Sequence, residues 1–260
     1  MTSYLDIDGK VVLITGASEG VGAACAASFR RRGARLALTA RSEAKLRQAA
    51  GSGDFVVTGD LMRPEDRLRI VASALEHYGS VDILINNAGV GLYSTAWQAP
   101  MPQARDLFEL NLFAPLEMIQ LVVPPMRTKR QGCIVNVGSI AGKITLPWFT
   151  LYSASKYALG SLTDGLRMEL KRDGIHAMTV CPGYVDTGFH NHVLSGRPPH
   201  AMSSRRKFAI TAQQCAEAIA RGVERNARTV VTPRLGWLFI GAARLFPSLV
   251  EAQMERMSGA

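Results

Sequence analysis

Short runs of β-branched and aliphatic residues recur along the chain, and most are followed by a stretch whose apolar positions have helical spacing. We expect strands at residues 10–15, 34–39, 54–58, 81–86, 133–137, 175–180 and 229–232. These runs are apolar throughout rather than alternating, which is typical of strands covered on both faces. The pattern therefore predicts a buried, mostly parallel sheet.

The stretches between the runs predict helices. We expect them at residues 21–32, in a short segment after an N-cap at Ser42, and at residues 64–77, 104–128, 151–172 and 212–226. Strands that alternate with helices in this way indicate βαβ units. We find no internal repeat and no Gly/Ser-rich linker, so we expect one doubly wound α/β domain over residues 1–260, with helices on both faces of the central sheet.

The regular alternation ends after the sixth run. Residues 182–210 are rich in proline, glycine and polar side chains, and connections of this length are usually functional or mobile. We expect a substrate lid at about residues 184–210. A C-terminal extension at about residues 233–257 is amphipathic around Trp237, Phe239 and Phe246.

Composition narrows the class of protein. The chain has 260 residues, of which 47% are hydrophobic and 20% charged, as in ordinary globular proteins. We find no run of about 18 apolar residues and no secretory leader pattern. Cys25, Cys133, Cys181 and Cys215 are widely spaced, which disfavours a zinc site or a redox pair and predicts small buried side chains in a reducing cytoplasm. We expect no metal site.

The net charge of +9 is unevenly distributed. Residues 1–50 carry 8 basic and 4 acidic groups, residues 51–196 carry 12 and 13, and residues 197–260 carry 10 and 4. A nucleic-acid-binding protein would show a dense basic stripe or a known module, and the sequence has neither. We expect a solvated basic surface and no nucleic-acid partner.

A glycine-rich turn joins the first strand to the first helix. In Thr15-Gly-Ala-Ser-Glu-Gly-Val-Gly22, the glycines allow positive φ and a close backbone approach. The following helix presents unpaired N–H groups and the positive end of its dipole. This arrangement predicts a site for the pyrophosphate of a dinucleotide.

Two residues four positions apart, Tyr152 and Lys156, lie on one face of a predicted helix. A free phenol has a pKa near 10, and a neighbouring cation favours phenolate, so we expect Lys156 to lower the pKa of Tyr152 toward the range of a usable acid/base. Ser139 follows the fifth strand, where its hydroxyl can bind a substrate oxygen at the carboxyl edge of the sheet.

Asn111 lies in the longest predicted helix, four residues before Pro115. Because proline has no N–H group, the carbonyl of Asn111 loses its usual helical partner. We expect either a tolerated kink or a free carbonyl that binds another donor, such as water.

Together these features resemble the short-chain dehydrogenase/reductase family over most of the chain, to about residue 232. The resemblance implies a Rossmann-like fold and a catalytic tetrad of Asn111, Ser139, Tyr152 and Lys156. Asn86-Asn-Ala-Gly89 is similar to a family segment that stabilises the sheet beside the cofactor, and residues 182–187 resemble the segment that binds the nicotinamide carboxamide. The cofactor-binding residues implied are Gly16, Ser18, Glu19, Gly20, Val21, Gly22, Arg41, Asp60, Leu61, Asn87, Ala88, Gly89, Tyr152, Lys156, Pro182, Gly183, Val185 and Thr187.

The second strand indicates which dinucleotide is bound. A carboxylate at its end would bind the adenosine ribose and select NAD, but Thr39-Ala-Arg-Ser42 has none. Arg41 can instead pair with a 2′-phosphate, helped by Ser18. We expect NADP to be preferred over NAD; a surface role for Arg41 is the alternative.

The resemblance implies hydride transfer between NADP(H) and a ketone or secondary alcohol. In it, Ser139 and Tyr152 hold the carbonyl oxygen, Tyr152 supplies the proton, and Lys156 binds the nicotinamide ribose and resupplies Tyr152 through water on the Asn111 carbonyl. Bulky apolar residues in the expected pocket favour a substrate with a hydrophobic body: Leu92, Tyr93, Ile144, Leu146, Trp148, Phe149, Tyr184 and Phe189.

Alternatives remain open. Arg205-Arg-Lys207 can attract a carrier-bound 3-oxoacyl group, and a non-catalytic NADP-binding regulator is the competing class. We expect a homodimer or homotetramer. The C-terminal extension could pack between subunits, close the pocket or lie on an anionic membrane.

Overall fold

Seven parallel strands form the central sheet of the computed structural model, which describes residues 5–191, 193–196 and 209–258. The strands are β1 (Val11–Thr15), β2 (Arg35–Ala40), β3 (Phe55–Thr58), β4 (Ile83–Asn86), β5 (Gly132–Val137), β6 (Ile175–Pro182) and β9 (Thr229–Thr232). Their order is β3-β2-β1-β4-β5-β6-β9. The strand order therefore reverses between β1 and β4, where open α/β sheets bind ligands.

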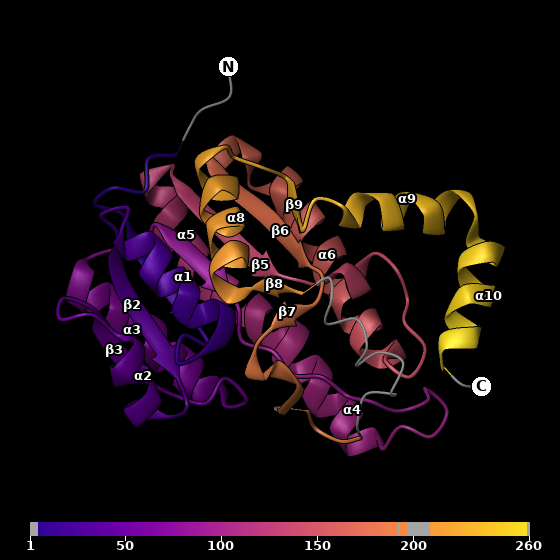
Figure 1. The fold of residues 1–260 in the computed structure, drawn as a ribbon. Helices are drawn as coiled ribbons and strands as arrows, with labels where there is room; N and C mark the ends of the chain where they lie inside the picture. The colour runs from indigo at the N-terminus through magenta and orange to yellow at the C-terminus, as the bar shows by residue number, and fades with distance from the viewer. Residues whose placement is uncertain (1–4, 192, 197–208, 259–260) are drawn as a thin grey trace.

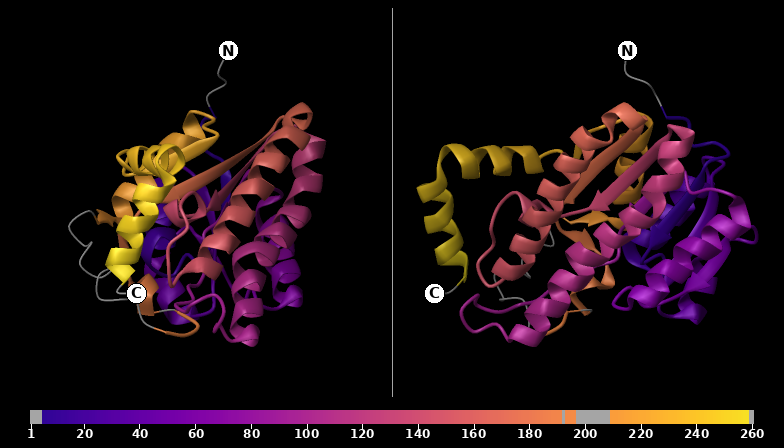
Figure 2. Two further views of the ribbon diagram at one scale, coloured as in Figure 1. Left: turned by 90° about the vertical axis from the view of Figure 1, so that its right-hand side faces the viewer. Right: turned by 180° about the vertical axis from the view of Figure 1, so that it is seen from behind.

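Helices cover both faces of this sheet (Figures 1 and 2). They are α1 (Gly20–Arg30), α2 (Glu43–Ala49), α3 (Pro64–Tyr78), α4 (Met101–Phe108), α5 (Ala114–Lys129), α6 (Thr150–Glu169) and α8 (Ala212–Glu224). Helices α1 and α8 pack together on one face, while α3, α5 and α6 cover the other. The expected doubly wound α/β fold is confirmed.

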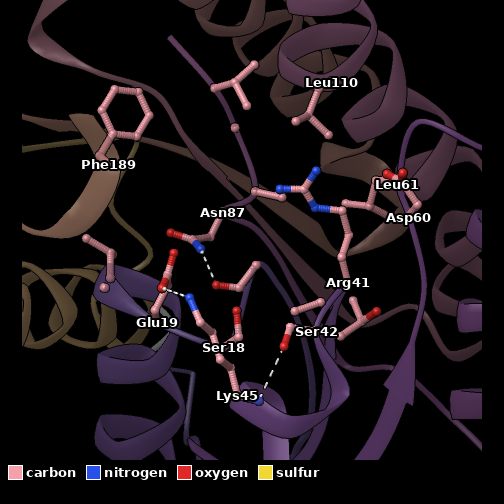
Figure 3. A pocket seen from close by; sticks show the side chains of 18 of the residues that line it. Ser18, Glu19, Arg41, Ser42, Lys45, Asp60, Leu61, Asn87, Leu110 and Phe189 are labelled. Atoms are coloured by element: carbon pink, nitrogen blue, oxygen red, sulfur yellow. Dashed lines mark hydrogen bonds and ion pairs between the residues drawn. The ribbon is translucent and has the colours of Figure 1, made fainter. Parts of the chain in front are cut away.

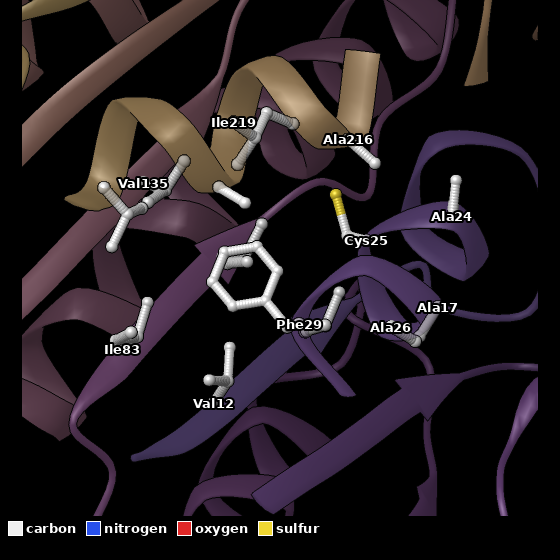
Figure 4. Close-up of a cluster of buried hydrophobic side chains, with 14 of the residues drawn as sticks. Val12, Ala17, Ala24, Cys25, Ala26, Phe29, Ile83, Val135, Ala216 and Ile219 are labelled. Carbon is white, nitrogen blue, oxygen red and sulfur yellow. The ribbon is translucent and has the colours of Figure 1, made fainter. Parts of the chain in front are cut away.

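The larger apolar core lies between the sheet and the pair α1 and α8. Phe29 of α1 is fully buried there against Val12 and Ile83 of the strands and Ile219 of α8 (Figure 4). All four cysteines are free and buried, as the sequence predicts. A second core on the opposite face holds Ile70 of α3 together with residues of α5.

The longest helical stretch, Met101–Lys129, contains a π-helical segment, η1 (Glu109–Phe113). The N–H of Ala114 reaches back five residues to the Glu109 carbonyl, which replaces an α-helical bond at this point. The kink expected near Asn111 is therefore a π-helical turn. By length and composition this stretch resembles a membrane span; here its α5 part packs on the sheet through Met118 and Val122.

Helix α6 ends at Glu169, three residues before the predicted end. A 3₁₀ turn, η3 (Lys171–Asp173), and the left-handed Gly174 follow and lead into β6. The strand can start there only because Gly174 fits: a Cβ would lie 2.2 Å from the Arg130 carbonyl oxygen.

The connection after β6 is more ordered than the sequence indicates. Its strand β7 (Val185–Asp186) pairs with β8 (Ile210–Thr211), and η4 (Gly188–Asn191) follows Thr187. The expected lid at residues 184–210 is described only in part. Arg205, Arg206 and Lys207 lie outside the described residues.

The C-terminal extension consists of two helices, α9 (Gly236–Leu245) and α10 (Pro247–Ser258), rather than one amphipathic segment. Pro247 cannot continue α9, so the chain turns at Phe246. We call residues 235–258 the C-terminal arm. In Figures 1 and 2 it projects from the body of the molecule, with α10 folded back at an angle to α9.

Candidate active site

A groove with a volume of about 280 Å³ crosses the carboxyl edge of the sheet at the reversal of strand order. Its lining comes from the turns after β1, β2, β3 and β4 and from η1 and η4 (Figure 3). The lining residues are Gly16, Ser18, Glu19, Gly20, Val21, Thr39, Ala40, Arg41, Ser42, Lys45, Gly59, Asp60, Leu61, Met62, Asn87, Ala88, Gly89, Val90, Leu110, Thr187, Gly188 and Phe189.

The glycine turn that follows β1 is possible only with glycine at two positions. Gly16 has a φ of 63°, and a Cβ on Gly22 would lie 2.1 Å from the Gly16 carbonyl oxygen. Asn87 holds the turn from the next strand, since its Nδ2 donates to the carbonyl oxygens of Thr15 (2.9 Å) and Gly16 (3.1 Å). These hydrogen bonds hold the backbone of the glycine turn in place beside the groove.

Helix α1 begins at this turn with unpaired N–H groups. Its first helical bond runs from the N–H of Ala23 to the Glu19 carbonyl (3.2 Å), so the N–H groups of the preceding residues have no helical partner. The first turn contains no acidic residue, and the Glu19 side chain makes no capping bond within the described chain. Such an N-terminus suits a phosphate anion.

Two cationic side chains, one carboxylate and one serine lie at the end of the groove beside β2. Arg41 reaches over the groove in Figure 3, and Lys45, in the first turn of α2, pairs with Glu19 at 3.2 Å. Ser42 caps α2 by accepting from the Lys45 N–H (3.5 Å), as predicted. Sequence reasoning missed Lys45, which lies in the first turn of α2 and lines the groove together with Arg41.

Thr39 provides a direct test of whether a dinucleotide fits here. Thr39 lines the groove, and its hydroxyl is buried and has no hydrogen-bond partner among the described residues. Buried hydroxyl groups rarely remain unpaired. The unpaired hydroxyl, the glycine turn and the open helix N-terminus together fit a bound dinucleotide.

The loop after β3 is fixed to the π-helical segment by a buried arginine. Nε of Arg67 donates to the Leu61 carbonyl (2.6 Å), and its guanidinium forms ion pairs with Glu109 and Glu117. Asp60 accepts from the Met62 N–H through Oδ1 (3.0 Å). Arg67 therefore links the groove floor to the helix that carries Asn111, a contact that the sequence did not indicate.

The structure places twelve of the eighteen predicted cofactor residues along the groove. Six others do not line it: Gly22, Tyr152, Lys156, Pro182, Gly183 and Val185. Gly22 packs beneath the glycine turn instead. Lys156 borders the groove, because its Nζ would lie 3.4 Å from a Cβ placed on Gly89.

Asn111 is fully buried, and it is the side chain that makes the observed contacts. Its Oδ1 accepts from the Val90 N–H (2.9 Å), and its Nδ2 donates to the Val90 carbonyl (3.0 Å) and to Oγ of Ser155 (3.1 Å). Ser155 in turn donates to the Tyr152 carbonyl (2.7 Å). Sequence reasoning considered only the backbone carbonyl of Asn111 and missed Ser155 entirely.

Tyr152 is buried in a stack of aromatic rings. Its ring lies 4.1 Å from that of Phe149, which stacks in turn on Tyr93 at 4.4 Å. Burial raises the pKa of Tyr152 to about 12, although a hydrogen bond with Ser139 lowers it. The expected lowering by Lys156 is not seen for the chain alone, where desolvation is the largest influence on this pKa and the lowering contribution comes from Ser139.

Lys156 is buried one helical turn after Tyr152, with its Nζ 5.7 Å from the centre of the tyrosine ring. The ammonium donates to the Val137 carbonyl at the end of β5 (3.0 Å). Burial lowers its pKa to about 8, so it is largely protonated at neutral pH. Two of its three N–H donors remain for other partners.

Ser139 follows β5 and begins the 3₁₀ turn η2 (Ile140–Gly142). Its Oγ accepts from the Ala141 N–H (3.1 Å) and is also hydrogen-bonded to Tyr152. Ser139, Tyr152 and Lys156 are therefore brought together beside the groove, and Asn111 is joined to them through Ser155. A neutral phenol and hydroxyl backed by an ammonium can bind and protonate an oxygen atom.

The walls beyond Tyr152 are apolar. The buried cluster contains Val90, Leu92, Tyr93, Leu107, Ala141, Phe149 and Tyr152, with Leu146 and Phe189 packed against it. The ring of Phe189 meets Tyr152 edge-on at 5.8 Å. Of the other residues predicted to line the pocket, Ile144 packs in a separate cluster with Cys181 and Ile240. Among the described residues, no group of His, Cys, Asp or Glu could hold a metal ion.

Comparison with known proteins places this geometry in a family. Residues 10–197 match the family described as short chain dehydrogenase. Ketoacyl reductase HetN of Nostoc sp. is 31% identical over 258 residues, which cover 94% of this chain and 88% of that protein. Dehydrogenase/reductase SDR family member 7B of Mus musculus is 38% identical over 187 residues, but this match spans 68% of the chain and only 58% of the relative.

Solved structures agree with these matches. A short chain dehydrogenase/reductase from Burkholderia phymatum in complex with NAD has a TM-score of 0.84 and 26% identity, covering 94% of this chain and 96% of that one. One from Burkholderia cenocepacia in complex with NADP has a TM-score of 0.81 and 26% identity, covering 96% and 99%. Relatives of this fold thus bind either dinucleotide.

Proposed function

The chain belongs to the short-chain dehydrogenase family, and on that premise we propose that it transfers hydride between NADP(H) and a ketone or secondary alcohol. The observation that carries this proposal is the meeting of Ser139, Tyr152 and Lys156 beside a groove that fits a dinucleotide. We therefore infer an oxidoreductase that acts on CH–OH donors and needs no metal.

The cofactor would lie along the groove with its pyrophosphate at the glycine turn and the N-terminus of α1. When bound, it supplies or accepts the hydride. Asp60 and the unpaired Thr39 hydroxyl border the adenosine end, while Asn87, Ala88 and Gly89 extend toward Lys156. In the same proposal Pro182, Gly183, Val185 and Thr187 hold the nicotinamide end.

NADP preference is supported by charge at the end of β2. Arg41 and Lys45 both line the groove there, and residues 39–42 include no carboxylate. Two acidic residues, Glu19 and Asp60, also line the groove, and Glu19 pairs with Lys45 and leaves Arg41 for another partner. We propose that the 2′-phosphate pairs with Arg41.

The high pKa of Tyr152 suits the reductive direction. At neutral pH the phenol keeps its proton, so it can donate that proton to a carbonyl oxygen as hydride reaches the carbon. The Ser139 hydroxyl, already bonded to Tyr152, would hold the same oxygen. Lys156 would hold the nicotinamide ribose and return a proton to Tyr152 through water at the Asn111 carbonyl.

We propose a substrate with a hydrophobic body. The aromatic stack of Tyr93, Phe149 and Tyr152, with Phe189 against it, offers mainly apolar surface next to the reacting oxygen. A carrier-bound 3-oxoacyl group is a second candidate, since one relative is named a ketoacyl reductase. A non-catalytic regulator is disfavoured, because such a protein has no need of a connected Ser139, Tyr152 and Lys156.

A homo-oligomer is supported by exposed apolar side chains on two helical segments that pack together. The exposed side chains are Phe113 of η1 and Tyr157 and Met168 of α6, and η1 and α6 contact each other. We propose a homodimer or homotetramer that buries them. A cytoplasmic location is supported by four free, buried thiols.

The first test is steady-state oxidation of NADPH and NADH with ketones of graded size and polarity. We expect turnover that prefers NADPH and rises with the apolar surface of the ketone. Adding a 3-oxoacyl thioester to the panel tests the second candidate substrate, a carrier-bound 3-oxoacyl group. Binding of NADPH without turnover of any carbonyl compound would contradict the proposal and favour the regulator.

The second test replaces the proposed acid. Tyr152→Phe keeps the ring stack but removes the hydroxyl, so we expect turnover to fall at least about a thousandfold while NADPH affinity stays within about twofold. Tyr157→Phe is the matched control, since this exposed phenol lies five residues further along the same helix. Normal turnover by the Tyr152 variant would refute the assignment.

A further inference from the structure

The C-terminal arm exposes an unusual amount of apolar surface. Seven large hydrophobic side chains on it are between 47% and 75% exposed: Leu235, Trp237, Leu238, Phe239, Leu245, Phe246 and Leu249. They account for half of the exposed large hydrophobic side chains in the described chain. Contiguous apolar surface of this kind marks a place where a protein or a membrane binds.

Helix α9 is apolar on both of its faces. On the inner face Gly236 and Ile240 are buried, and Ile240 packs with Val231 and Ile144 of the body. The outer face carries Leu238 and other exposed residues of the set above. A helix that is apolar all round normally lies in a protein core or in lipid, so among the described residues the outer face lacks the cover that its composition requires.

The charges around this apolar surface are positive. From residue 226 to residue 250 the sequence contains no Asp or Glu. Arg234 and Arg244 are exposed near the two ends of α9, and neither forms an ion pair with another described residue. Acidic side chains return only along α10, at Glu251 and Glu255. The apolar part of the arm is thus cationic and its last two turns are polar.

The shape of the arm favours a planar partner. The exposed residues Leu245 and Phe246 lie where α9 turns into α10, at the outer corner of the arm in Figures 1 and 2. An apolar corner flanked by arginine and carrying Trp237 has the composition of segments that enter the headgroup region of anionic bilayers. We propose that the C-terminal arm docks on an anionic lipid surface.

Docking would bring the active-site loop close to that surface. Ile240 shares a cluster with Ile144, and Ile140 packs against the same cluster. Ile140 directly follows Ser139 and begins η2, and Ile144 lies two residues after the end of η2. The arm is therefore attached to the loop that carries one of the proposed catalytic groups.

The experiment is co-sedimentation of the full chain with vesicles of phosphatidylcholine alone and with vesicles that also contain phosphatidylglycerol. We expect binding to the anionic vesicles, weakened by high salt because of the arginines. Leu238→Ser/Leu245→Ser should weaken binding at least about tenfold, since both side chains lose their apolar contact with lipid. Leu68→Ser on α3, a residue 58% exposed on the other side of the molecule, is the matched control.

Charge is tested separately with Arg234→Gln/Arg244→Gln against Lys129→Gln, an exposed cation at the end of α5. Only the arginine pair should reduce binding to anionic vesicles. The mass of each variant in solution is measured by light scattering. If the leucine variant loses self-association while vesicle binding is unchanged, or if the wild type binds neither vesicle, the arm is not a lipid-docking surface and the proposal is overturned.

Discussion

The candidate catalytic centre and the C-terminal arm differ in how their side chains are covered. In the centre, buried polar side chains meet partners within the chain, as Asn111 does through Val90 and Ser155. In the arm, large apolar side chains such as Leu245 and Leu249 remain exposed although the helices are formed. The side chain of Asn111 is thus paired within the chain, whereas the apolar side chains of the arm are not covered by the described residues.

The contrast agrees with the two functions that we propose, chemistry at the centre and docking at the arm. Chemistry needs groups held at fixed distances, and a connected buried network provides that. Docking needs apolar surface that is already exposed before the partner binds, and the C-terminal arm at the edge of the fold provides such surface. Four predictions test the contrast, from the largest expected effect to the smallest.

The first prediction concerns pH, because burial in the centre changes proton affinity. Burial lowers the pKa of Lys156 from 10.5 to about 8, so its charge is lost as pH rises through about 8. We expect carbonyl reduction to fall by about tenfold per pH unit above that value. The measurement is kcat/KM against pH, with thermal unfolding over the same range as the control. A rate that stays flat up to pH 10 would show that the lysine charge is not needed.

The second prediction removes the central connection of the network. Asn111→Ala leaves the buried N–H and carbonyl of Val90 without their partner, so we expect the free energy of unfolding to fall by about 2–4 kcal/mol. Gln253→Ala in the arm is exposed and should change it by less than about 0.5 kcal/mol. Chemical denaturation measures both. Equal effects would contradict the proposed difference between the two regions.

The third prediction compares the two faces of α9. Ile240→Ala opens a cavity against the body and should cost about 2–4 kcal/mol of unfolding free energy. Leu245→Ala, exposed five residues later, should change stability by no more than about 0.5 kcal/mol in the absence of vesicles. A large loss in the second variant would mean that the outer face is already covered in solution.

The fourth prediction concerns Arg41, an exposed residue that we propose binds the 2′-phosphate of NADPH. Arg41→Ala should weaken NADPH binding by about tenfold and leave NADH binding nearly unchanged, since only NADPH carries the 2′-phosphate. Arg47→Ala is the matched control, an exposed arginine on α2 that pairs with Glu43. Fluorescence titration measures both affinities. Equal loss for the two dinucleotides would assign Arg41 a general role instead.

Most of the sheet and its helices could be predicted because the signals are local. Each of the seven strands lies within a residue or two of an apolar run, and Ser42 and Pro64 begin their helices as expected. The arm was harder to predict. Its apolar residues predicted one amphipathic extension, whereas its division into α9 and α10 depends on the turn at Phe246, and its attachment to the body depends on the packing of Ile240.

The candidate site divides in the same way. The spacing of Tyr152 and Lys156 follows from helical geometry, and the glycine turn from the conformations that only glycine allows. Ser42 as the N-cap of α2 was also predictable from the sequence. The connection from Arg67 to Leu61 and Glu109 was not, because these residues are 6 and 42 positions apart and belong to different elements.

The order of strands and helices, the glycine turn and the tyrosine–lysine pair are properties of the sequence, since each depends on residues within one element or one turn. Tertiary structure decided three other features: the raised pKa of Tyr152, the role of the Asn111 side chain, and the exposed outer face of the arm. Burial and pairing arise between segments far apart in the chain, as between Asn111 and Ser155 at a separation of 44 residues. Local spacing contains no information about which distant group will displace water from a given side chain.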